Sequence, residues 1–148
     1  PAITLDAREV PSEPAAWETV QLPLAPALLT CAITNLVDNA LRYHRGPTPV
    51  SATLQWHAGT AGDGQVEICV RDQGPGLTAD ECGQALKRFW RKSGSDPGSG
   101  LGLTIVHRIA ESAGGTLVLE PGTPGLVARL RLSTCAADAA PAHGIAPG

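Results

Sequence analysis

The chain has 148 residues, 43% of them hydrophobic, and a formal net charge of −3 at pH 7. This length and composition are enough for one sizeable buried core, so we expect a single folded domain. The mildly acidic balance provides no basic field for a nucleic acid backbone, which argues against DNA or RNA as a partner. The four cysteines form no C-x-x-C pair and no zinc-type spacing, as is typical of reduced thiols in a cytosolic protein.

The start of the chain and its uncharged runs bear on membrane association. The uncharged run from Gln21 to Val37 contains two prolines and falls short of the roughly 20 apolar residues that a spanning helix needs. The opening segment, PAITLDAREVPSEP, lacks the pattern of a signal peptide and an initiator methionine. We therefore expect a fragment of a larger protein, with no direct membrane contact of its own.

The first half of the chain predicts a strand, a long helix and a hairpin. Residues 3–9 alternate between apolar and polar, which suits an edge strand, and prolines soon interrupt the pattern. Pro26 can begin a helix, and apolar residues then recur at three- and four-residue steps as far as Leu41. Residues 49–57 and 65–72 alternate with a period of two around a glycine-rich stretch, which predicts an antiparallel hairpin.

The second half predicts two helices and another hairpin. A short helical segment is expected near Ala79 to Phe89, followed by a mobile loop with the sequence RKSGSDPGSG. A second long helix follows from Thr104 and ends at Gly114. Residues 116–120 and 126–133 then alternate as a second hairpin.

This order of elements predicts the fold class. Strands and helices do not alternate regularly, so we expect an α+β two-layer sandwich and not a doubly wound fold. Its sheet should be mixed and mostly antiparallel, with about five strands and about three helices on one face. The domain is expected to span residues 1–134, and residues 135–148 have too little periodic apolar content to pack, which predicts a disordered tail.

The predicted long helix carries the segment TNLVDNALRYH, in which Asn35 and Asn39 are four residues apart. This spacing places both amides on one helix face, with Asp38 and Arg42 nearby. An amide oxygen can complete the coordination shell of Mg²⁺ without adding negative charge beside a polyphosphate. Alternatively, the two amides only occupy a solvated helix face.

The segment VRDQGPGL places Asp72 directly after an apolar strand, followed by Gly74 and Gly76. The two glycines allow a tight turn and a close approach of the backbone to a ligand. A carboxylate at this point can accept a hydrogen bond from an exocyclic amino group such as that of adenine. Alternatively, aspartate and glycine here have only their usual roles in a turn.

The segment GSGLGLTIV places Gly98, Gly100 and Gly102 before a predicted helix. Unpaired N–H groups and the helix dipole at such a position favour a bound phosphate. The spacing is not that of a dinucleotide-binding Rossmann motif, and no Walker A lysine follows. A glycine cluster could also serve only as a flexible joint.

In this order, the three segments resemble the N, G1 and G2 boxes of the GHKL ATP-binding superfamily. The most similar group is the catalytic and ATP-binding domain of bacterial sensor histidine kinases, and the resemblance spans residues from about 28 to 132. RFWRKSGSDPGSGLGLTIVHRIAESAGGTL resembles the F box of that group running into G2 and the next helix. The resemblance implies a Bergerat-type fold, with ATP and Mg²⁺ as cofactors.

The resemblance also implies roles for residues of the N and G1 boxes. Asn39 would coordinate Mg²⁺, and Asn35 would help to place the phosphates or the metal. Asp72 would bind the adenine amino group, Tyr43 would pack on the adenine, and Arg42 would lie near the phosphates. Further nucleotide-binding positions implied in the G1 box are Gly74, Gly76 and Leu77.

For the lid and the G2 box, the resemblance implies that Phe89 anchors the F box and that Arg91 reaches the γ-phosphate. Arg91 and Asn35 would be the catalytic residues. Trp90 stands where this group often has tyrosine, a mild departure. The remaining implied nucleotide-binding positions are Gly98, Ser99, Gly100, Leu101, Gly102 and Leu103.

The N box indicates which reaction the superfamily member performs. Related ATPases and serine kinases have a glutamate where this chain has Asn35, and asparagine cannot act as a general base. Histidine is a nucleophile in its neutral form, so the resemblance implies phosphoryl transfer to a histidine. The alternatives are a GHKL-type ATPase or serine kinase, and a nucleotide-binding module without catalysis.

The acceptor histidine is expected outside this chain. In the group resembled, that histidine precedes glutamate or aspartate, whereas the four histidines here precede arginine, alanine or glycine. The resemblance therefore implies a separate dimerisation and phosphotransfer domain as partner, and a response regulator downstream. It also implies the cytosolic part of an inner-membrane sensor kinase in two-component signalling, monomeric when isolated.

Overall fold

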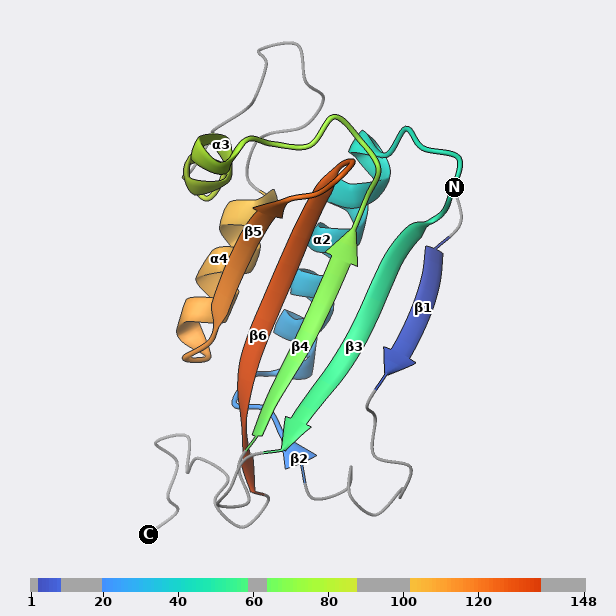
Figure 1. The fold of residues 1–148 in the computed structure, drawn as a ribbon. Helices are drawn as coiled ribbons and strands as arrows, with labels where there is room; N and C mark the ends of the chain where they lie inside the picture. The colour runs from blue at the N-terminus through green and yellow to red at the C-terminus, as the bar shows by residue number, and fades with distance from the viewer. Residues whose placement is uncertain (1–2, 9–19, 59–63, 88–101, 137–148) are drawn as a thin grey trace, which may run out of the picture.

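The computed structural model describes residues 3–8, 20–58, 64–87 and 102–136. Its six strands form one sheet in the order β1-β3-β4-β6, with β5 beside β6 and β2 at the end of β6 (Figure 1). The strands are β1 (Ile3–Arg8), β2 (Val20–Gln21), β3 (Val50–Ala58), β4 (Gly64–Arg71), β5 (Thr116–Pro121) and β6 (Leu126–Ala136). Only β1 pairs in parallel, with β3, and the other pairings are antiparallel. The predicted mixed, mostly antiparallel sheet is confirmed.

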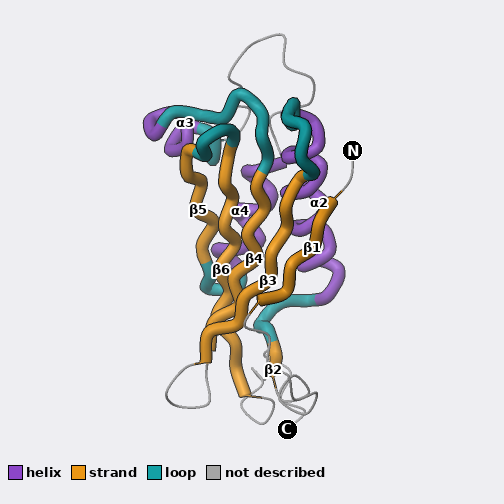
Figure 2. The backbone as a smooth tube through the Cα atoms, turned by 45° about the vertical axis from the view of Figure 1, so that its right-hand side comes forward, coloured by secondary structure: helices purple, strands orange, loops and turns teal. Residues whose placement is uncertain are grey.

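Three described helices accompany the sheet, as the sequence predicted. They are α2 (Pro26–Tyr43), α3 (Ala79–Gln84) and α4 (Gly102–Ser112). Helices α2 and α4 lie behind the sheet in Figure 1, and Figure 2 shows them on the same face from another angle. Helix α3 lies near the end of β5. The α+β two-layer sandwich is thus confirmed, and no described helix is long and apolar enough to cross a membrane.

Helix α2 forms where the apolar periodicity predicted it. Pro26 occupies its first turn, where the missing N–H of proline costs nothing. Its fully buried residues, Ala32, Leu36 and Ala40, recur every four positions and face the sheet. The helix ends at Tyr43, and the N–H of His44 closes the last turn on the carbonyl of Ala40 at 2.9 Å.

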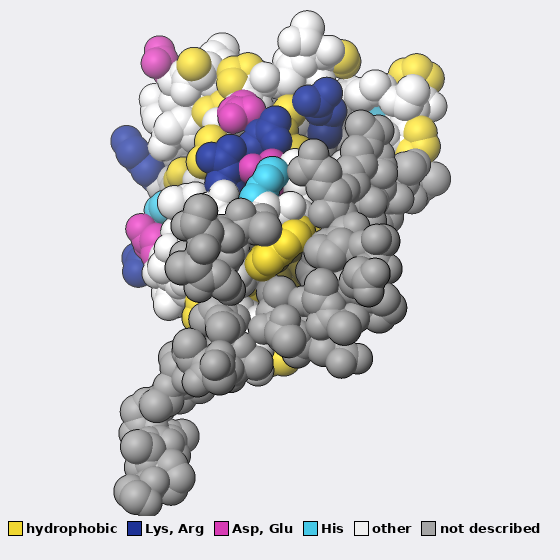
Figure 3. All heavy atoms as spheres, turned by 60° about the horizontal axis from the view of Figure 1, so that its bottom comes forward, with side chains coloured by type: hydrophobic (Ala, Val, Ile, Leu, Met, Phe, Trp, Pro, Cys, Tyr) yellow, Lys and Arg dark blue, Asp and Glu magenta, His cyan; other side chains and the backbone are white. Residues whose placement is uncertain are grey.

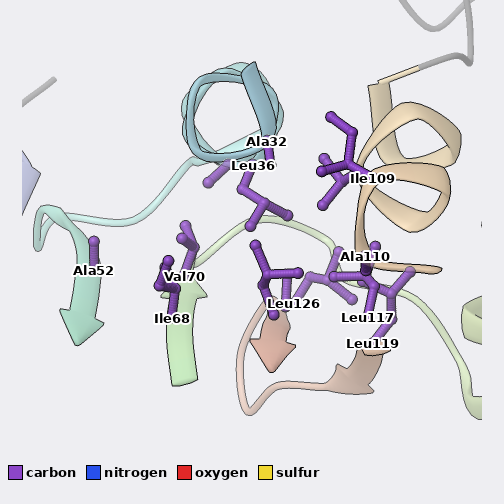
Figure 4. Close-up of a cluster of buried hydrophobic side chains, with 14 of the residues drawn as sticks. Ala32, Leu36, Ala52, Ile68, Val70, Ile109, Ala110, Leu117, Leu119 and Leu126 are labelled. Atoms are coloured by element: carbon purple, nitrogen blue, oxygen red, sulfur yellow. The ribbon is translucent and has the colours of Figure 1, made fainter. Parts of the chain in front are cut away.

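The core lies between the sheet and the two helices α2 and α4 (Figure 4). Alternation along each strand sends every second side chain inward, so that Val70 from β4 and Leu130 from β6 meet Leu36 and Ile109 from the helices. Leu130 and Leu36 are 0% and 1% exposed. The apolar residues of the strands and of the helices therefore form one common core. This packing fixes where the ends of the strands and helices lie.

The opposite face of the sheet carries charged side chains and no described helix. Glu67 of β4 is only 6% exposed there because two arginines of β6 cover it. Arg129 Nη1 donates to its Oε1 at 2.9 Å and Arg131 Nε to its Oε2 at 2.7 Å. Figure 3 shows acidic and basic side chains side by side on this face. These two ion pairs link β4 to β6 on the face of the sheet away from the core.

The structure departs from the sequence expectation at two places that meet. Strand β2 was not predicted, because its two residues are too short to show any alternation. It pairs Val20 with Ala136 and Gln21 with Cys135. The first two residues of the predicted disordered tail thus belong to β6, since β2 satisfies their backbone groups, and residues 137–148 lie outside the described residues.

Candidate functional site

Three chain segments end at the same edge of the sandwich, at the top of Figure 1. They are the C-terminal end of α2, the loop that follows β4, and the N-terminal end of α4. These are the segments that carry the N box, the G1 box and the last glycine of the G2 box. The fold therefore brings together three motifs that lie far apart in the sequence.

Asn35 connects the first and third of these segments. Its Nδ2 donates to the carbonyl of Cys31 at 2.8 Å, one turn earlier in α2. This leaves Oδ1 directed toward α4, where a Cβ atom added to Gly102 would lie 3.4 Å from it. The amide oxygen of Asn35 thus lies beside the first residue of α4, where unpaired N–H groups concentrate.

Asn39, Arg42 and Tyr43 follow Asn35 toward the end of α2. Asn39 and Tyr43 are half-buried, whereas Arg42 is exposed. No described residue forms a hydrogen bond with the Asn39 side chain, so its amide is available to a ligand. The predicted placement of Asn35 and Asn39 one helical turn apart follows from the continuous helix.

The end of α2 also contacts the G1 loop. Gly74 lies so close to the carbonyl of Tyr43 that any Cβ atom would overlap it. The backbone N–H of Gln73 donates to Nδ1 of His44 at 3.1 Å. No signal in a single sequence could reveal that His44 has this partner, which lies 29 residues away along the chain.

Asp72 is the most buried acid at this edge of the described structure, with 3% exposure. Its Oδ1 accepts hydrogen bonds from the N–H of Gly74 at 2.7 Å and of Leu126 at 3.4 Å. Burial raises the pKa of Asp72 above its ordinary value, although these two N–H groups and the nearby His44 oppose the shift. Both described hydrogen bonds use Oδ1, so Oδ2 remains able to accept from a ligand.

Gly125, which the sequence analysis did not single out, lies against Asp72. Gly125 precedes β6 with φ +94°, a conformation that other residues rarely adopt. A Cβ atom there would overlap the carbonyl of Asp72 and lie 2.9 Å from its Oδ1. Gly76, at φ +68°, also lies so close to the carbonyl of Gly125 that an added Cβ atom would overlap it. The turn before β6 therefore fits around Asp72, whereas its sequence indicated only a hairpin turn.

Comparison with known proteins identifies the family. The sequence profile of the histidine kinase-, DNA gyrase B-, and HSP90-like ATPases matches residues 25–134, which include all three segments. The chain belongs to this family. Its ATP-binding catalytic domain is of the sensor histidine kinase type, as the three sequence motifs predicted.

Individual relatives of this ATPase-family domain are sensor kinases. Sensor-like histidine kinase SenX3 of Mycolicibacterium smegmatis is 37% identical over 102 residues, covering 65% of this chain and 25% of that protein. Sensor protein QseC of Escherichia coli K12 is 41% identical over 90 residues, covering 60% of this chain and 18% of that protein. The chain thus corresponds to a quarter or less of the length of these relatives.

Solved structures of the same family share the fold. The mycobacterial sensor histidine kinase MprB gives a TM-score of 0.67 at 27% identity, covering 90% of this chain and 83% of that chain. The ATP binding domain of PrrB from Mycobacterium tuberculosis gives 0.59 at 30% identity, covering 88% of this chain and 77% of that chain. The arrangement of sheet and helices is therefore that of a histidine kinase ATP-binding domain.

The remaining predicted site residues divide into two groups. Leu77 and Leu103 are half-buried and pack against the core, next to the glycines of their boxes. The others lie outside the described residues: Phe89, Arg91, Gly98, Ser99, Gly100 and Leu101. The described part of the site accordingly comprises the loop after β4, one face of α2 and the beginning of α4.

The described donors can be tested against a magnesium ion. Nowhere among the described residues do three histidine, cysteine, aspartate or glutamate side chains form a metal-binding group. The Asn39 amide is a neutral oxygen ligand of the kind that Mg²⁺ accepts when phosphates supply the charge. The residues present thus fit a metal ion carried in with a nucleotide, with most of its ligands coming from phosphate and water.

Proposed function

We propose that this domain binds Mg–ATP between α2, the loop after β4 and the start of α4, and transfers the γ-phosphoryl group to a histidine of a separate domain. One observation supports this most: the carbonyl of Tyr43 touches Gly74, while the Asn35 amide oxygen faces Gly102. Segments from all three boxes therefore surround one edge, where a nucleotide could contact each of them.

At the base end, Asp72 would accept a hydrogen bond from the adenine amino group. Its Oδ1 is engaged by two backbone N–H groups, so Oδ2 is the atom assigned to the base. Tyr43 would pack on the adenine ring. Gly74, Gly76 and Leu77 would form the backbone wall beside the base, because residues without bulky side chains let the nucleotide come close.

At the phosphate end, Asn39 would hold Mg²⁺, and Asn35 and Arg42 would contact the phosphates or the metal. Bound Mg²⁺ would supply positive charge that neutralises the phosphate oxygens. Arg91 would stabilise the charge of the γ-phosphate, with Phe89 anchoring its segment. The phosphate loop would comprise Gly98, Ser99, Gly100, Leu101, Gly102 and Leu103.

Phosphoryl transfer to histidine would depend mainly on how the protein positions the reacting groups. Phosphoryl transfer needs little covalent assistance from the protein, and a neutral histidine already has a nucleophilic nitrogen. Asn35 cannot remove a proton from water, and its Nδ2 is occupied by the carbonyl of Cys31. This disfavours hydrolysis and supports transfer to histidine.

The wider assembly is part of the same proposal. The chain covers 25% of SenX3 and 18% of QseC, which supports an acceptor histidine on a dimerisation domain elsewhere in the whole protein. A response regulator would take the phosphoryl group from it. We place this domain on the cytoplasmic side of an inner-membrane sensor kinase, as a monomer when isolated, with no nucleic acid partner.

A transfer assay in trans tests the proposal. The domain is mixed with the histidine-bearing domain of the whole protein and radiolabelled ATP. We expect labelling by the parent, none by Asn39→Ala, and full labelling by Thr34→Ala, an exposed position of the same helix. Steady release of phosphate by the isolated chain would instead indicate an ATPase. ADP binding without any labelling would indicate a non-catalytic nucleotide module.

A further inference from the structure

The junction between the end of α2 and the G1 loop is held by three close approaches. The carbonyl of Tyr43 abuts Gly74, and a Cβ atom on Gly46 would overlap the side chain of Gln73. Between them, Nδ1 of His44 accepts the N–H of Gln73 at 3.1 Å. The first two contacts exclude side chains, and the third is directional.

The histidine contact acts on the peptide group next to the key acid. The N–H that His44 accepts belongs to the peptide bond joining Asp72 to Gln73. The following N–H, that of Gly74, turns back to Oδ1 of Asp72 at 2.7 Å. Fixing the first peptide plane therefore fixes where the Asp72 side chain emerges and which way its carboxylate faces.

The geometry also determines the proton on the imidazole. Nδ1 can accept a hydrogen bond only when it carries no proton, so the neutral ring has its proton on Nε2. His44 is half-buried at the end of α2, and Asp72 is 3% exposed.

We propose that His44 is a positioning residue for nucleotide binding, which ties the Asp72 loop to the helix that carries Asn35 and Asn39. The inference rests on the proposed function, since it assigns His44 a role in presenting Asp72 to the base. Helix α2 places the residues assigned to phosphate and metal, and the loop places the residue assigned to adenine. His44 sets the spacing between these two halves of the site.

The test compares two substitutions of similar size, of which only one can accept a hydrogen bond. His44→Asn puts an oxygen acceptor near the place of Nδ1, whereas His44→Leu keeps bulk and removes the acceptor. By calorimetry, we expect His44→Leu to bind Mg–ADP about 3- to 10-fold more weakly, as loss of one neutral hydrogen bond implies. His44→Asn should stay within about twofold of the parent. His57→Leu, near the far end of β3, is the matched control and should bind as the parent does.

A double-mutant cycle separates positioning from general stability. If His44 acts through Asp72, the Leu substitution should cost much less in an Asp72→Asn background than in the parent. Fully additive losses, or equal weakening by His44→Leu and His44→Asn, would overturn the proposal. So would ADP binding by His44→Leu that matches the parent.

A measurement on the unmodified chain covers the case in which His44→Leu fails to fold. Nitrogen-15 NMR of the imidazole should show the proton on Nε2 at neutral pH and a coupling between Nδ1 and the Gln73 N–H. A proton on Nδ1 would overturn the inference. A parent that binds no ADP while showing the expected ring state would instead remove the proposed function, and with it the nucleotide role of His44.

Discussion

Replacement of Asp72 by asparagine separates binding from folding. Asparagine has nearly the same size and keeps an oxygen that can accept from Gly74 and Leu126, which lie 2.7 and 3.4 Å from Oδ1. It removes the negative charge and places an amide NH₂ group where Oδ2 stood. The adenine amino group would then face a donor in place of a charged acceptor.

We expect Asp72→Asn to weaken Mg–ADP binding by about 1.5 to 3 kcal/mol, roughly 10- to 150-fold, because a hydrogen bond to a charged group is lost. Isothermal titration calorimetry of the parent and the variant measures this directly. Asp80→Asn, an exposed acid in the first turn of α3, is the matched control and should bind ADP normally.

The same substitution should not destabilise the nucleotide-free fold at neutral pH. Burial raises the pKa of Asp72 above 3.8, so the folded state holds that proton more tightly than the unfolded chain does. The free energy of unfolding of the parent therefore falls as pH rises from 3.8 through the folded pKa, and Asp72→Asn lacks this contribution. Urea unfolding at several pH values follows the difference.

Either of two results would contradict part of this reasoning about Asp72. It would fail if the variant bound ADP as tightly as the parent, because the carboxylate would then not contact the base. Marked destabilisation of the nucleotide-free variant at pH 7 would show instead that the charge supports the fold.

Three further predictions concern stability, measured by urea unfolding. Gly125→Ala should lower the free energy of unfolding by about 2 kcal/mol and weaken ADP binding, because φ is +94° and a Cβ atom would overlap the Asp72 carbonyl. The control, Gly83→Ala, should be neutral or slightly stabilising, because an added Cβ atom there has nothing within 4 Å. Burial alone would raise the pKa of Glu67, but the hydrogen bonds and charges of Arg131 and Arg129 together outweigh it and hold that pKa below 4.5. Glu67→Gln should therefore cost about 1 to 2 kcal/mol of unfolding free energy at pH 7 and progressively less below pH 4.5. Leu130→Ala, at a fully buried position, should cost about 2 to 5 kcal/mol, against less than about 1 kcal/mol for Leu28→Ala at 43% exposure. Equal costs within either matched pair, or a pH-independent effect at Glu67, would contradict these assignments.

Local sequence patterns determined most of the elements of this protein. The apolar stripe after Pro26 predicted α2, and strict alternation predicted both hairpins, because the side-chain periods of helix and strand are fixed by backbone geometry. The spacing of Asn35 and Asn39, and the glycines after Asp72, indicated a nucleotide site for the same local reason. These features depend on residues only a few positions apart.

The tertiary structure alone decided how those pieces meet. Nothing local in the sequence signals that His44 accepts from Gln73, 29 residues away, or that Leu126 donates to Asp72 across 54 residues. The pairing of the two-residue β2 with the end of β6 is of the same kind. Such contacts arise when the sheet and the two helices close on a common core, so their partners are fixed by packing in three dimensions and carry no periodic signal along the chain.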